Sequence, residues 1–203
     1  MAGGRGLRLG RNKALEKIGQ QTLIQRAVSR LLFLDTEIIV VTGPHNMELG
    51  LEDFGGVRLL IDTYPGRGPL VGIYTGLLNS RSEKSLVTAC DMPFLNSGLI
   101  DYMKDISTGY DAVVPRIGSE VEPLYAIYSK RCLIEAKYLL DEGKYSIRRL
   151  FQQVRVRYVE AEEINHFDPE HMSFLNINNE SDLAKARETL EKERLAPGTI
   201  LMN

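Results

Sequence analysis

The sequence predicts an α/β fold in three layers, with helices on both faces of a mostly parallel sheet. Short runs rich in β-branched residues alternate along the chain with longer segments of helical spacing. Several of these runs are apolar throughout, as expected of strands that are buried on both faces. The 203 residues, 43% hydrophobic and 26% charged, contain no internal repeat or Pro/Gly-rich linker, which indicates one globular domain.

Six segments are predicted to be strands because they are short, apolar and rich in β-branched residues. They are residues 37–43, 57–64, 85–93, 111–117, 123–129 and 154–161. The runs IIVV and SLVTA do not alternate between apolar and charged residues and are mainly apolar, so they are predicted to be central strands. The run VRVRYVEA alternates instead, which favours an edge position for it.

Five segments with helical spacing lie between or after these strands. They are residues 22–34, 68–81, 96–107, 129–143 and 180–194. Together the elements predict a Rossmann-like α/β/α sandwich as a single domain over residues 1–195. The tail at residues 196–203 begins with an Ala-Pro-Gly stop and is expected to be disordered or to form an oligomer contact.

The charge balance excludes several classes of partner. With 25 basic and 27 acidic side chains the formal charge is -2, so no overall basic field favours nucleic acid or an anionic membrane. No apolar segment is long enough to span a bilayer. Cys90 and Cys132 lie far apart and form no disulfide framework, which indicates a reducing compartment. We therefore expect a cytoplasmic protein with no nucleic-acid or membrane partner.

The chain opens with a basic, glycine-rich stretch, GGRGLRLGRNK at residues 3–13. Small residues let backbone N–H groups approach a triphosphate, and the basic side chains would neutralise it. The stretch is not a Walker A loop, because Lys13 is preceded by Asn12 and followed by Ala14. It also misses the dinucleotide-binding spacing, because Gly10 comes one residue late. A disordered basic terminus explains these residues equally well.

Two carboxylates favour the phosphate-binding interpretation. Asp62 closes a predicted strand before the turn PGRGP, and Asp91 directly follows another predicted strand in CDMPF. Ligands of open α/β sheets bind beyond the carboxyl ends of strands, so both should face the same crevice as the opening loop. Asp91 is well placed to bind Mg²⁺, which prefers oxygen ligands. Asp91 could instead cap the next helix, but Asn96 and Ser97 can do that themselves.

The sequence resembles nucleotidyltransferases that transfer NMP from an NTP. The resemblance rests on three segments that follow one another along the chain: the opening loop, Asp62 before PGRGPLVGI, and CDMPF. The later segments EPLYAIY, GKYSIRRLF and FLNINNESDL are similar to molybdenum cofactor guanylyltransferases, so the resemblance covers nearly the whole chain. It implies Mg²⁺-dependent transfer of GMP from GTP to the phosphate of molybdenum-bearing molybdopterin, with release of pyrophosphate. It also implies a molybdoenzyme or a cofactor-delivery protein as a partner.

The resemblance assigns roles to residues at matching positions. The nucleotide-binding loop includes four residues at the start: Met1, Ala2, Gly3 and Gly4. Lys13 is implied to bind phosphates, with Arg8 as a second catalytic cation. Asp62 is implied to contact the nucleotide, and Asp91 to serve as the catalytic metal ligand.

The resemblance also implies roles for three further positions. Thr42 is implied to bind the nucleotide, although the family often has an asparagine at this position and the threonine hydroxyl has a shorter reach. Asn176 and Asn178 are implied to line the acceptor side. The sequence leaves it open whether Asn178 does this or caps the last helix.

Other functions remain compatible with these residues. A cytidylyltransferase acting on molybdopterin, or a transferase acting on another sugar or alcohol phosphate, would need few changes around the base. A non-catalytic nucleotide-binding paralogue would keep the crevice without turnover. The joint presence of Lys13, Asp62 and Asp91 favours an enzyme.

The start of the sequence carries one more expectation. Only Met1 and Ala2 precede the loop glycines, where the resemblance implies a central strand of several apolar residues. We therefore expect this first strand to be missing from the 203 residues and to lie upstream. Without it, the neighbouring strands would expose unpaired edges.

Overall fold

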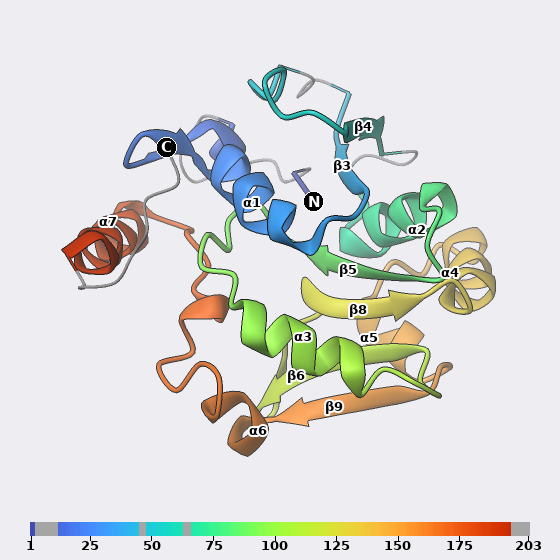
Figure 1. The fold of residues 1–203 in the computed structure, drawn as a ribbon. Helices are drawn as coiled ribbons and strands as arrows, with labels where there is room; N and C mark the ends of the chain where they lie inside the picture. Colours follow the sequence, from blue (N-terminus) through green and yellow to red (C-terminus); the bar gives the residue numbers. More distant parts are fainter. Residues whose placement is uncertain (3–11, 45–47, 63–65, 196–203) are drawn as a thin grey trace.

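The computed structural model describes residues 1–2, 12–44, 48–62 and 66–195, in which strands and helices alternate (Figure 1). This arrangement confirms the predicted α/β class. Gly3, Gly4 and Arg8 and the tail at residues 196–203 lie outside the described residues.

The strands form three sheets among the described residues. Two of these sheets have two strands each, an antiparallel hairpin of β1 (Lys17–Ile18) with β2 (Gln21–Thr22), and a parallel pair of β3 (Ile38–Thr42) with β4 (Val57–Ile61). The third sheet has five strands: β5 (Lys84–Thr88), β8 (Tyr125–Ser129), β6 (Ala112–Ile117), β7 (Glu120–Val121) and β9 (Val156–Glu160). All six predicted strands are therefore present, with shorter bounds.

The five-stranded sheet is mixed, so the expectation of a mostly parallel sheet is wrong for β8. β8 runs antiparallel to both β5 and β6, whereas β6 and β9 are parallel. A parallel neighbour needs a crossover of about a dozen residues or more. Residues 118–124, which connect β6 to β8, are too few for one. The alternating strand β9 pairs only with β6 among the described strands, which confirms its predicted edge position.

The five predicted helical segments all contain a helix. These are α1 (Leu23–Leu31), α2 (Pro69–Asn79), α3 (Ser97–Asp105), α4 (Cys132–Asp141) and α7 (Glu180–Leu195). Two helices not predicted from the sequence, α5 (Ile147–Phe151) and α6 (Ala161–Asn165), are too short to show a helical period. The 3₁₀ turns are η1 (Lys13–Leu15), η2 (Leu32–Leu34) and η3 (Met172–Phe174). Among the described residues, no helix is both long and apolar enough to cross a membrane.

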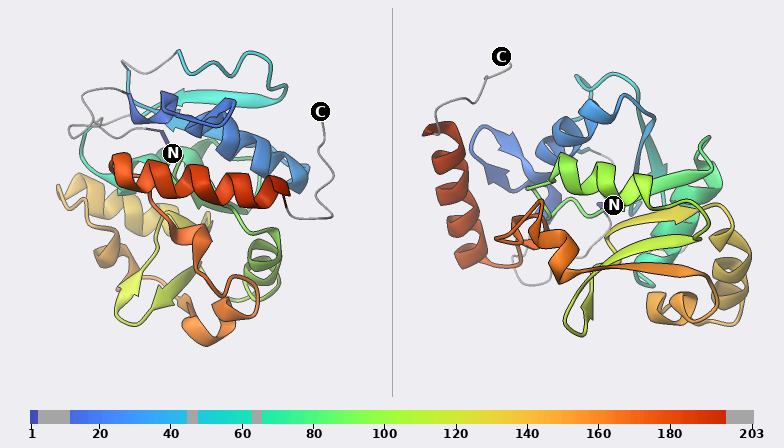
Figure 2. Two further views of the ribbon diagram at one scale, coloured as in Figure 1. Left: turned by 90° about the vertical axis from the view of Figure 1, so that its left-hand side faces the viewer. Right: turned by 60° about the horizontal axis from the view of Figure 1, so that its bottom comes forward.

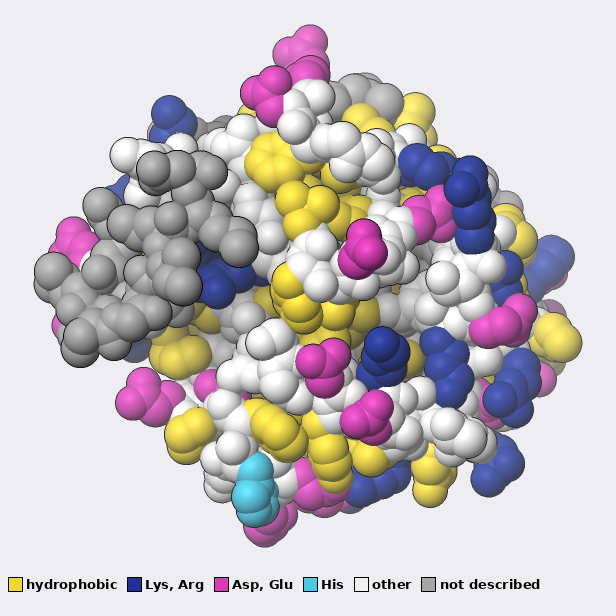
Figure 3. Space-filling model, in the orientation of Figure 1, with side chains coloured by type: hydrophobic (Ala, Val, Ile, Leu, Met, Phe, Trp, Pro, Cys, Tyr) yellow, Lys and Arg dark blue, Asp and Glu magenta, His cyan; other side chains and the backbone are white. Residues whose placement is uncertain are grey.

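Helices cover both faces of the five-stranded sheet. Val114 of β6 packs in a cluster with α2, α4 and α5, while its neighbour Val113 packs with α3 and α6. Successive strand residues point to opposite faces, which is why both faces are apolar. α7 lies at one side of the molecule beside the β1–β2 hairpin (Figure 2). Acidic and basic side chains are interspersed over much of the face in Figure 3, in keeping with the small net charge.

Met1 and Ala2 connect the parallel pair of β3 and β4 to the five-stranded sheet. The Met1 nitrogen donates to the Thr88 carbonyl at 2.6 Å, and the Cys90 N–H donates to the Met1 carbonyl at 3.1 Å. On the other side, the Ala2 N–H donates to the Val41 carbonyl at 2.9 Å. The start of the described chain is therefore held between β3 and β5.

Candidate active site

Three side chains from distant parts of the sequence meet at one point. The Lys13 Nζ donates to Asp91 Oδ2 at 2.5 Å and to Asn178 Oδ1 at 2.9 Å. The Lys13 and Asp91 side chains are 17% and 22% exposed, so the ion pair is shielded from bulk water yet still reachable by a ligand. Lys13 is the first residue of η1, and the Asn12 side chain caps this turn by accepting a hydrogen bond from the Ala14 N–H at 3.1 Å. The cap fixes the backbone position of Lys13. The structure thus unites two predicted catalytic residues with a predicted acceptor residue.

The backbone around Asp91 explains this convergence. Asp91 lies just beyond the end of β5, next to Cys90. The Cys90 N–H donates a hydrogen bond to the Met1 carbonyl. The Asp91 carbonyl accepts a hydrogen bond from the Ile177 N–H at 3.0 Å. That bond holds the segment containing Asn178 against the end of β5. The side chain of Asn96 caps α3 by accepting from the Leu99 N–H at 2.9 Å, so capping leaves Asp91 for the site.

The ends of β3 and β4 bring two more predicted residues to this edge. Thr42 is fully buried at the end of β3, and its hydroxyl lies 3.3 Å from the Ala2 carbonyl, to which it donates. The Asp62 N–H donates to the Thr42 carbonyl at 2.7 Å, which places Asp62 immediately beyond β4. Thr42 therefore supports the backbone of the opening loop.

The hydrogen bonds at the start of α7 do not use the side chain of Asn178 as the helix cap. The Asn179 side chain accepts from the Asp182 N–H at 3.0 Å, and the Asp182 carboxylate accepts from the N–H groups of Asn178 and Asn179. These bonds cap the helix through backbone groups and through Asn179. The Asn178 side chain is consequently directed to Lys13. Asn176 makes a longer contact, from Nδ2 to the Phe174 carbonyl at 3.5 Å.

Glu122 belongs to the surroundings of the site but was not predicted. Burial raises the pKa of this half-buried carboxyl, and the charges of Glu120 and Asp91 raise it further. The charge of Asp91 thus adds to burial and to Glu120 in disfavouring the ionised form of Glu122. A carboxylate directly before the apolar strand in EPLYAIY was the available sequence signal.

The residues present fit a magnesium ion that is shared with a nucleotide better than a preformed metal cage. Among the described residues, no group of three or more His, Cys, Asp or Glu side chains could hold a metal. Mg²⁺ is commonly bound through one or two carboxylates together with substrate phosphates and water. Asp91 alone offers a donor of this kind at the end of β5.

Comparison with known proteins agrees with this geometry. The sequence matches the MobA-like NTP transferase domain family over residues 1–159. A probable molybdenum cofactor guanylyltransferase from Pelotomaculum thermopropionicum is 38% identical over 194 residues, which cover 96% of this chain and 93% of that protein. The chain belongs to the molybdenum cofactor guanylyltransferase family. A further probable guanylyltransferase of this family, from Methanosarcina mazei, is 38% identical over 90% of this chain and 86% of its own.

A solved structure of the same family has the same fold. The molybdopterin-guanine dinucleotide biosynthesis protein A of Archaeoglobus fulgidus superposes with a TM-score of 0.81 at 26% identity, covering 94% of this chain and 96% of that one. The 2-C-methyl-D-erythritol 4-phosphate cytidylyltransferase of Thermus thermophilus, at a TM-score of 0.65 and 18% identity, shares the fold alone. Membership of the guanylyltransferase family confirms that this protein is a nucleotidyltransferase, as its motifs predicted.

The cysteines of this nucleotidyltransferase are expected to be unreactive in the folded chain. Burial raises the pKa of Cys90 to about 11 and that of Cys132 to about 12. At pH 8 about one Cys90 in a thousand would be a thiolate, so alkylation should be about a hundredfold slower than for a free cysteine. Mass spectrometry after timed iodoacetamide treatment, with and without denaturant, measures this. Fast labelling of Cys90 in the folded chain would contradict the burial of its thiol.

Proposed function

We propose that this protein transfers GMP from GTP to the terminal phosphate of molybdenum-bearing molybdopterin and releases pyrophosphate. The observation that carries the proposal is the contact of Lys13 with both Asp91 and Asn178 at the carboxyl end of β5. Its relatives named molybdenum cofactor guanylyltransferase support the choice of nucleotide and acceptor.

The proposed reaction is an in-line displacement at phosphorus. A phosphate oxygen of the acceptor forms a bond to the α-phosphorus of GTP, and the bond from that phosphorus to the pyrophosphate oxygen breaks. The electron pair of the broken bond leaves with pyrophosphate. Both reactants are anions, so the protein must supply positive charge and fixed orientation.

Lys13 is proposed to supply the fixed positive charge near the phosphates, with Arg8 as a second cation. Asp91 would hold Mg²⁺, and the ion would supply positive charge that offsets the negative charge of the phosphates. Asn178 holds the Lys13 ammonium through its side-chain oxygen and so limits the positions that this ammonium can take. The charge is thereby oriented before the nucleotide arrives.

Backbone and carboxylate groups around the loop complete the proposed site. Met1 and Ala2, fixed between β3 and β5, lead into Gly3 and Gly4, whose backbone would approach the triphosphate. Asp62 is proposed to contact the nucleotide, and Thr42 to position the loop through Ala2. Asn176 and Asn178 are proposed to line the acceptor side.

The wider setting of the enzyme is also proposed. The helices on both faces of the five-stranded sheet support a three-layer α/β/α sandwich for the whole domain. Two buried, unpaired cysteines support a cytoplasmic location. A molybdoenzyme or a cofactor-delivery protein would receive the product.

The nucleotide is tested by measuring pyrophosphate release from GTP, CTP, ATP and UTP with the same molybdenum-bearing molybdopterin and Mg²⁺. We expect kcat/KM for GTP to exceed the others by about a hundredfold or more, because a wrong base leaves polar groups of the site unpaired. Omission of the acceptor is the control. A preference for CTP would identify a cytidylyltransferase, and binding without any release would identify a non-catalytic paralogue.

A further inference from the structure

The carboxylate of Glu122 lies near the candidate site and has no hydrogen-bond or ion-pair partner among the described residues. The residue is half-buried, between β7 and β8. Burial and the charges of Glu120 and Asp91 raise its pKa, so the fold disfavours the ionised form. A partly buried carboxylate without a partner lowers stability. We therefore expect its partner to be a ligand.

Glu122 is the first residue of a bulge between β7 and β8. The two strands pair with the same edge of β6, because β9 occupies the other edge. If the register of β7 on β6 continued, residue 124 would lie opposite Val113. Ile127 lies there instead, so residues 122–124 are an insertion of three. Bulges next to active sites commonly change the direction in which a side chain points.

Hydrogen bonds fix the backbone of this bulge. The Glu122 N–H donates to the Pro115 carbonyl at 3.0 Å, and the Tyr125 N–H donates to the Glu122 carbonyl at 3.2 Å. The Tyr128 hydroxyl donates to the Pro123 carbonyl at 2.8 Å. Both backbone groups of Glu122 are thus bonded within the protein, while its carboxylate is left for a ligand.

The bulge lies against the end of β5. The Ala89 N–H donates to the Leu124 carbonyl at 3.1 Å, and Asp91 follows two residues after Ala89. The effect of the Asp91 charge on the pKa of Glu122 agrees with this placement. Glu122 therefore borders the candidate site on the side of β5 that faces β8.

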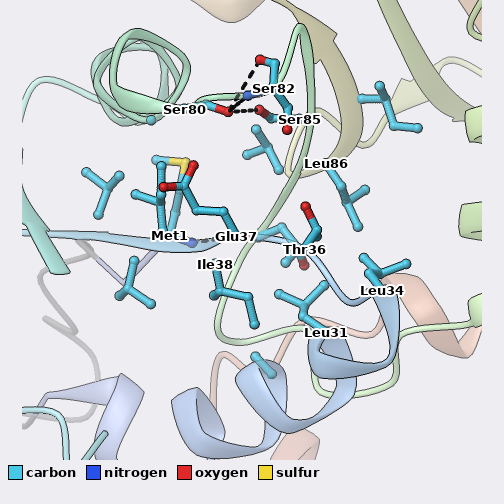
Figure 4. Close-up of a pocket in the computed structure, with 18 of the residues that line it drawn as sticks. Met1, Leu31, Leu34, Thr36, Glu37, Ile38, Ser80, Ser82, Ser85 and Leu86 are labelled. Atoms are coloured by element: carbon cyan, nitrogen blue, oxygen red, sulfur yellow. Dashed lines mark hydrogen bonds between the residues drawn. The ribbon is translucent and has the colours of Figure 1, made fainter. Parts of the chain in front are cut away.

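The other side of β5 has a different chemistry. Met1 and Ala2, which lead into the opening loop, are bonded there between β5 and β3. Farther along that side, a cavity of about 430 Å³ between β3 and β5 is lined mainly by apolar side chains such as Leu31 and Ile38 (Figure 4). A polar ring would find few hydrogen-bond partners there. With GTP at the opening loop, the acceptor is expected to extend toward β8 and Glu122.

We propose that the Glu122 carboxylate binds the pterin ring of the acceptor, by accepting hydrogen bonds from its exocyclic amino group and the neighbouring ring N–H. This inference rests on the proposed function, which supplies the acceptor. The phosphate and the molybdenum dithiolene of that acceptor are negatively charged, so a carboxylate repels them. The N–H edge of the pterin offers two adjacent donors, which match the two oxygens of a carboxylate.

The test compares pterin with lumazine, in which a second carbonyl replaces the amino group. Neither ring has a phosphate to react, so both can be titrated with the protein while GTP and Mg²⁺ are present. The chain has no tryptophan, so the fluorescence of the ring reports binding directly. We expect the unchanged chain to bind pterin about tenfold or more tightly than lumazine. Glu122→Gln should reduce this ratio to about one, and an equal ratio in both chains would overturn the proposal.

Steady-state kinetics provide a second readout. Glu122→Gln should raise the KM for the acceptor by about tenfold or more and leave the KM for GTP and the Mg²⁺ dependence unchanged. Glu120→Gln is the matched control, because it removes an exposed carboxylate that pairs with Arg148 at 3.5 Å. It should alter none of these values. If Glu122→Gln changed the KM for GTP or the Mg²⁺ dependence instead, the carboxylate would serve the nucleotide or the metal, and the proposal would be wrong.

The stability of the variant separates ligand binding from a structural role. Because the fold disfavours the ionised carboxylate, Glu122→Gln should leave Tm unchanged or raise it by about 1 °C at neutral pH. A lower Tm with an unchanged pterin-to-lumazine ratio would give Glu122 a structural role and overturn the proposal.

Failure of the proposed function would give a different pattern. A chain that transfers no GMP, but whose pterin-to-lumazine ratio depends on Glu122, would reject the reaction and keep the pterin contact. GMP transfer without any dependence of the ratio on Glu122 would reject the pterin contact alone.

Discussion

Replacement of Asp91 by alanine is expected to lower kcat/KM for GTP by about a thousandfold or more. A metal that polarises phosphate oxygens contributes several kcal/mol to the transition state, and about 1.4 kcal/mol corresponds to tenfold in rate. Asp91 is the carboxylate at the end of β5 that lies against Lys13 and next to the loop anchored by Met1. Pyrophosphate release at varied Mg²⁺ measures the effect, and circular dichroism checks that the variant is folded.

Two further variants show whether the charge of Asp91 is responsible. Asp91→Asn keeps the shape of the side chain and removes its charge, so its loss should approach that of the alanine variant. Asp141→Ala removes an exposed carboxylate that pairs with Lys137 on α4, and it should leave turnover unchanged. Turnover near the normal level in Asp91→Ala would exclude the metal assignment.

Replacement of Lys13 by alanine should lower kcat/KM for GTP by about a hundredfold to a thousandfold, the usual effect of removing one preorganised group that stabilises transition-state charge. Lys13→Arg should not restore the rate, because the wider guanidinium cannot occupy the position of a compact ammonium 2.5 Å from Asp91. Steady-state kinetics with GTP and acceptor varied separately provide the measurement. Lys137→Ala, on the surface of α4, is the matched control.

A purely structural role for Lys13 gives a different result. If Lys13 served only to hold the segment before α7, Asn178→Ala would reproduce the full loss, since the Lys13 contact to that segment is the one to Asn178. We expect Asn178→Ala to raise the KM for the acceptor and to lower kcat much less than Lys13→Ala does, because it loosens the Lys13 ammonium without removing its charge. Equal losses of kcat in both variants would contradict the proposed phosphate contact of Lys13.

Much of the fold was predictable because the hydrophobic pattern is strong. The long helices have a clear helical period, the six main strands are short runs rich in β-branched residues, and the edge position of β9 followed from its alternating residues. The short helices α5 and α6 have too few residues to show a period. The direction of β8 depends on the short connection from β6, which makes the two strands antiparallel. The alternation of strands and helices along the chain predicted parallel strands without considering the length of this connection.

The sequence allowed candidate residues of the site to be named, but it did not show which of them contact one another. Asp91 and Lys13 could be named because a carboxylate after a buried strand and a lysine after a glycine-rich loop have chemical uses that are evident locally. Their contact with each other depends on how β5 and η1 are placed in space. Local sequence does not show that the Asn178 side chain contacts Lys13 while the Asn179 side chain caps α7. It also does not show that Asp91 affects the pKa of Glu122.

The sequence by itself determined the α/β class, the order of its main elements, the guanylyltransferase family and the residues most suited to phosphate chemistry. These depend on local periodicity and on motifs, which any stretch of chain carries within itself. Only the tertiary structure decided that Lys13 meets Asp91 and Asn178, that β8 runs antiparallel to its neighbours, and that an apolar cavity lies between β3 and β5. Such features depend on contacts between residues far apart in the chain, and those contacts form only when the sheets and helices pack together.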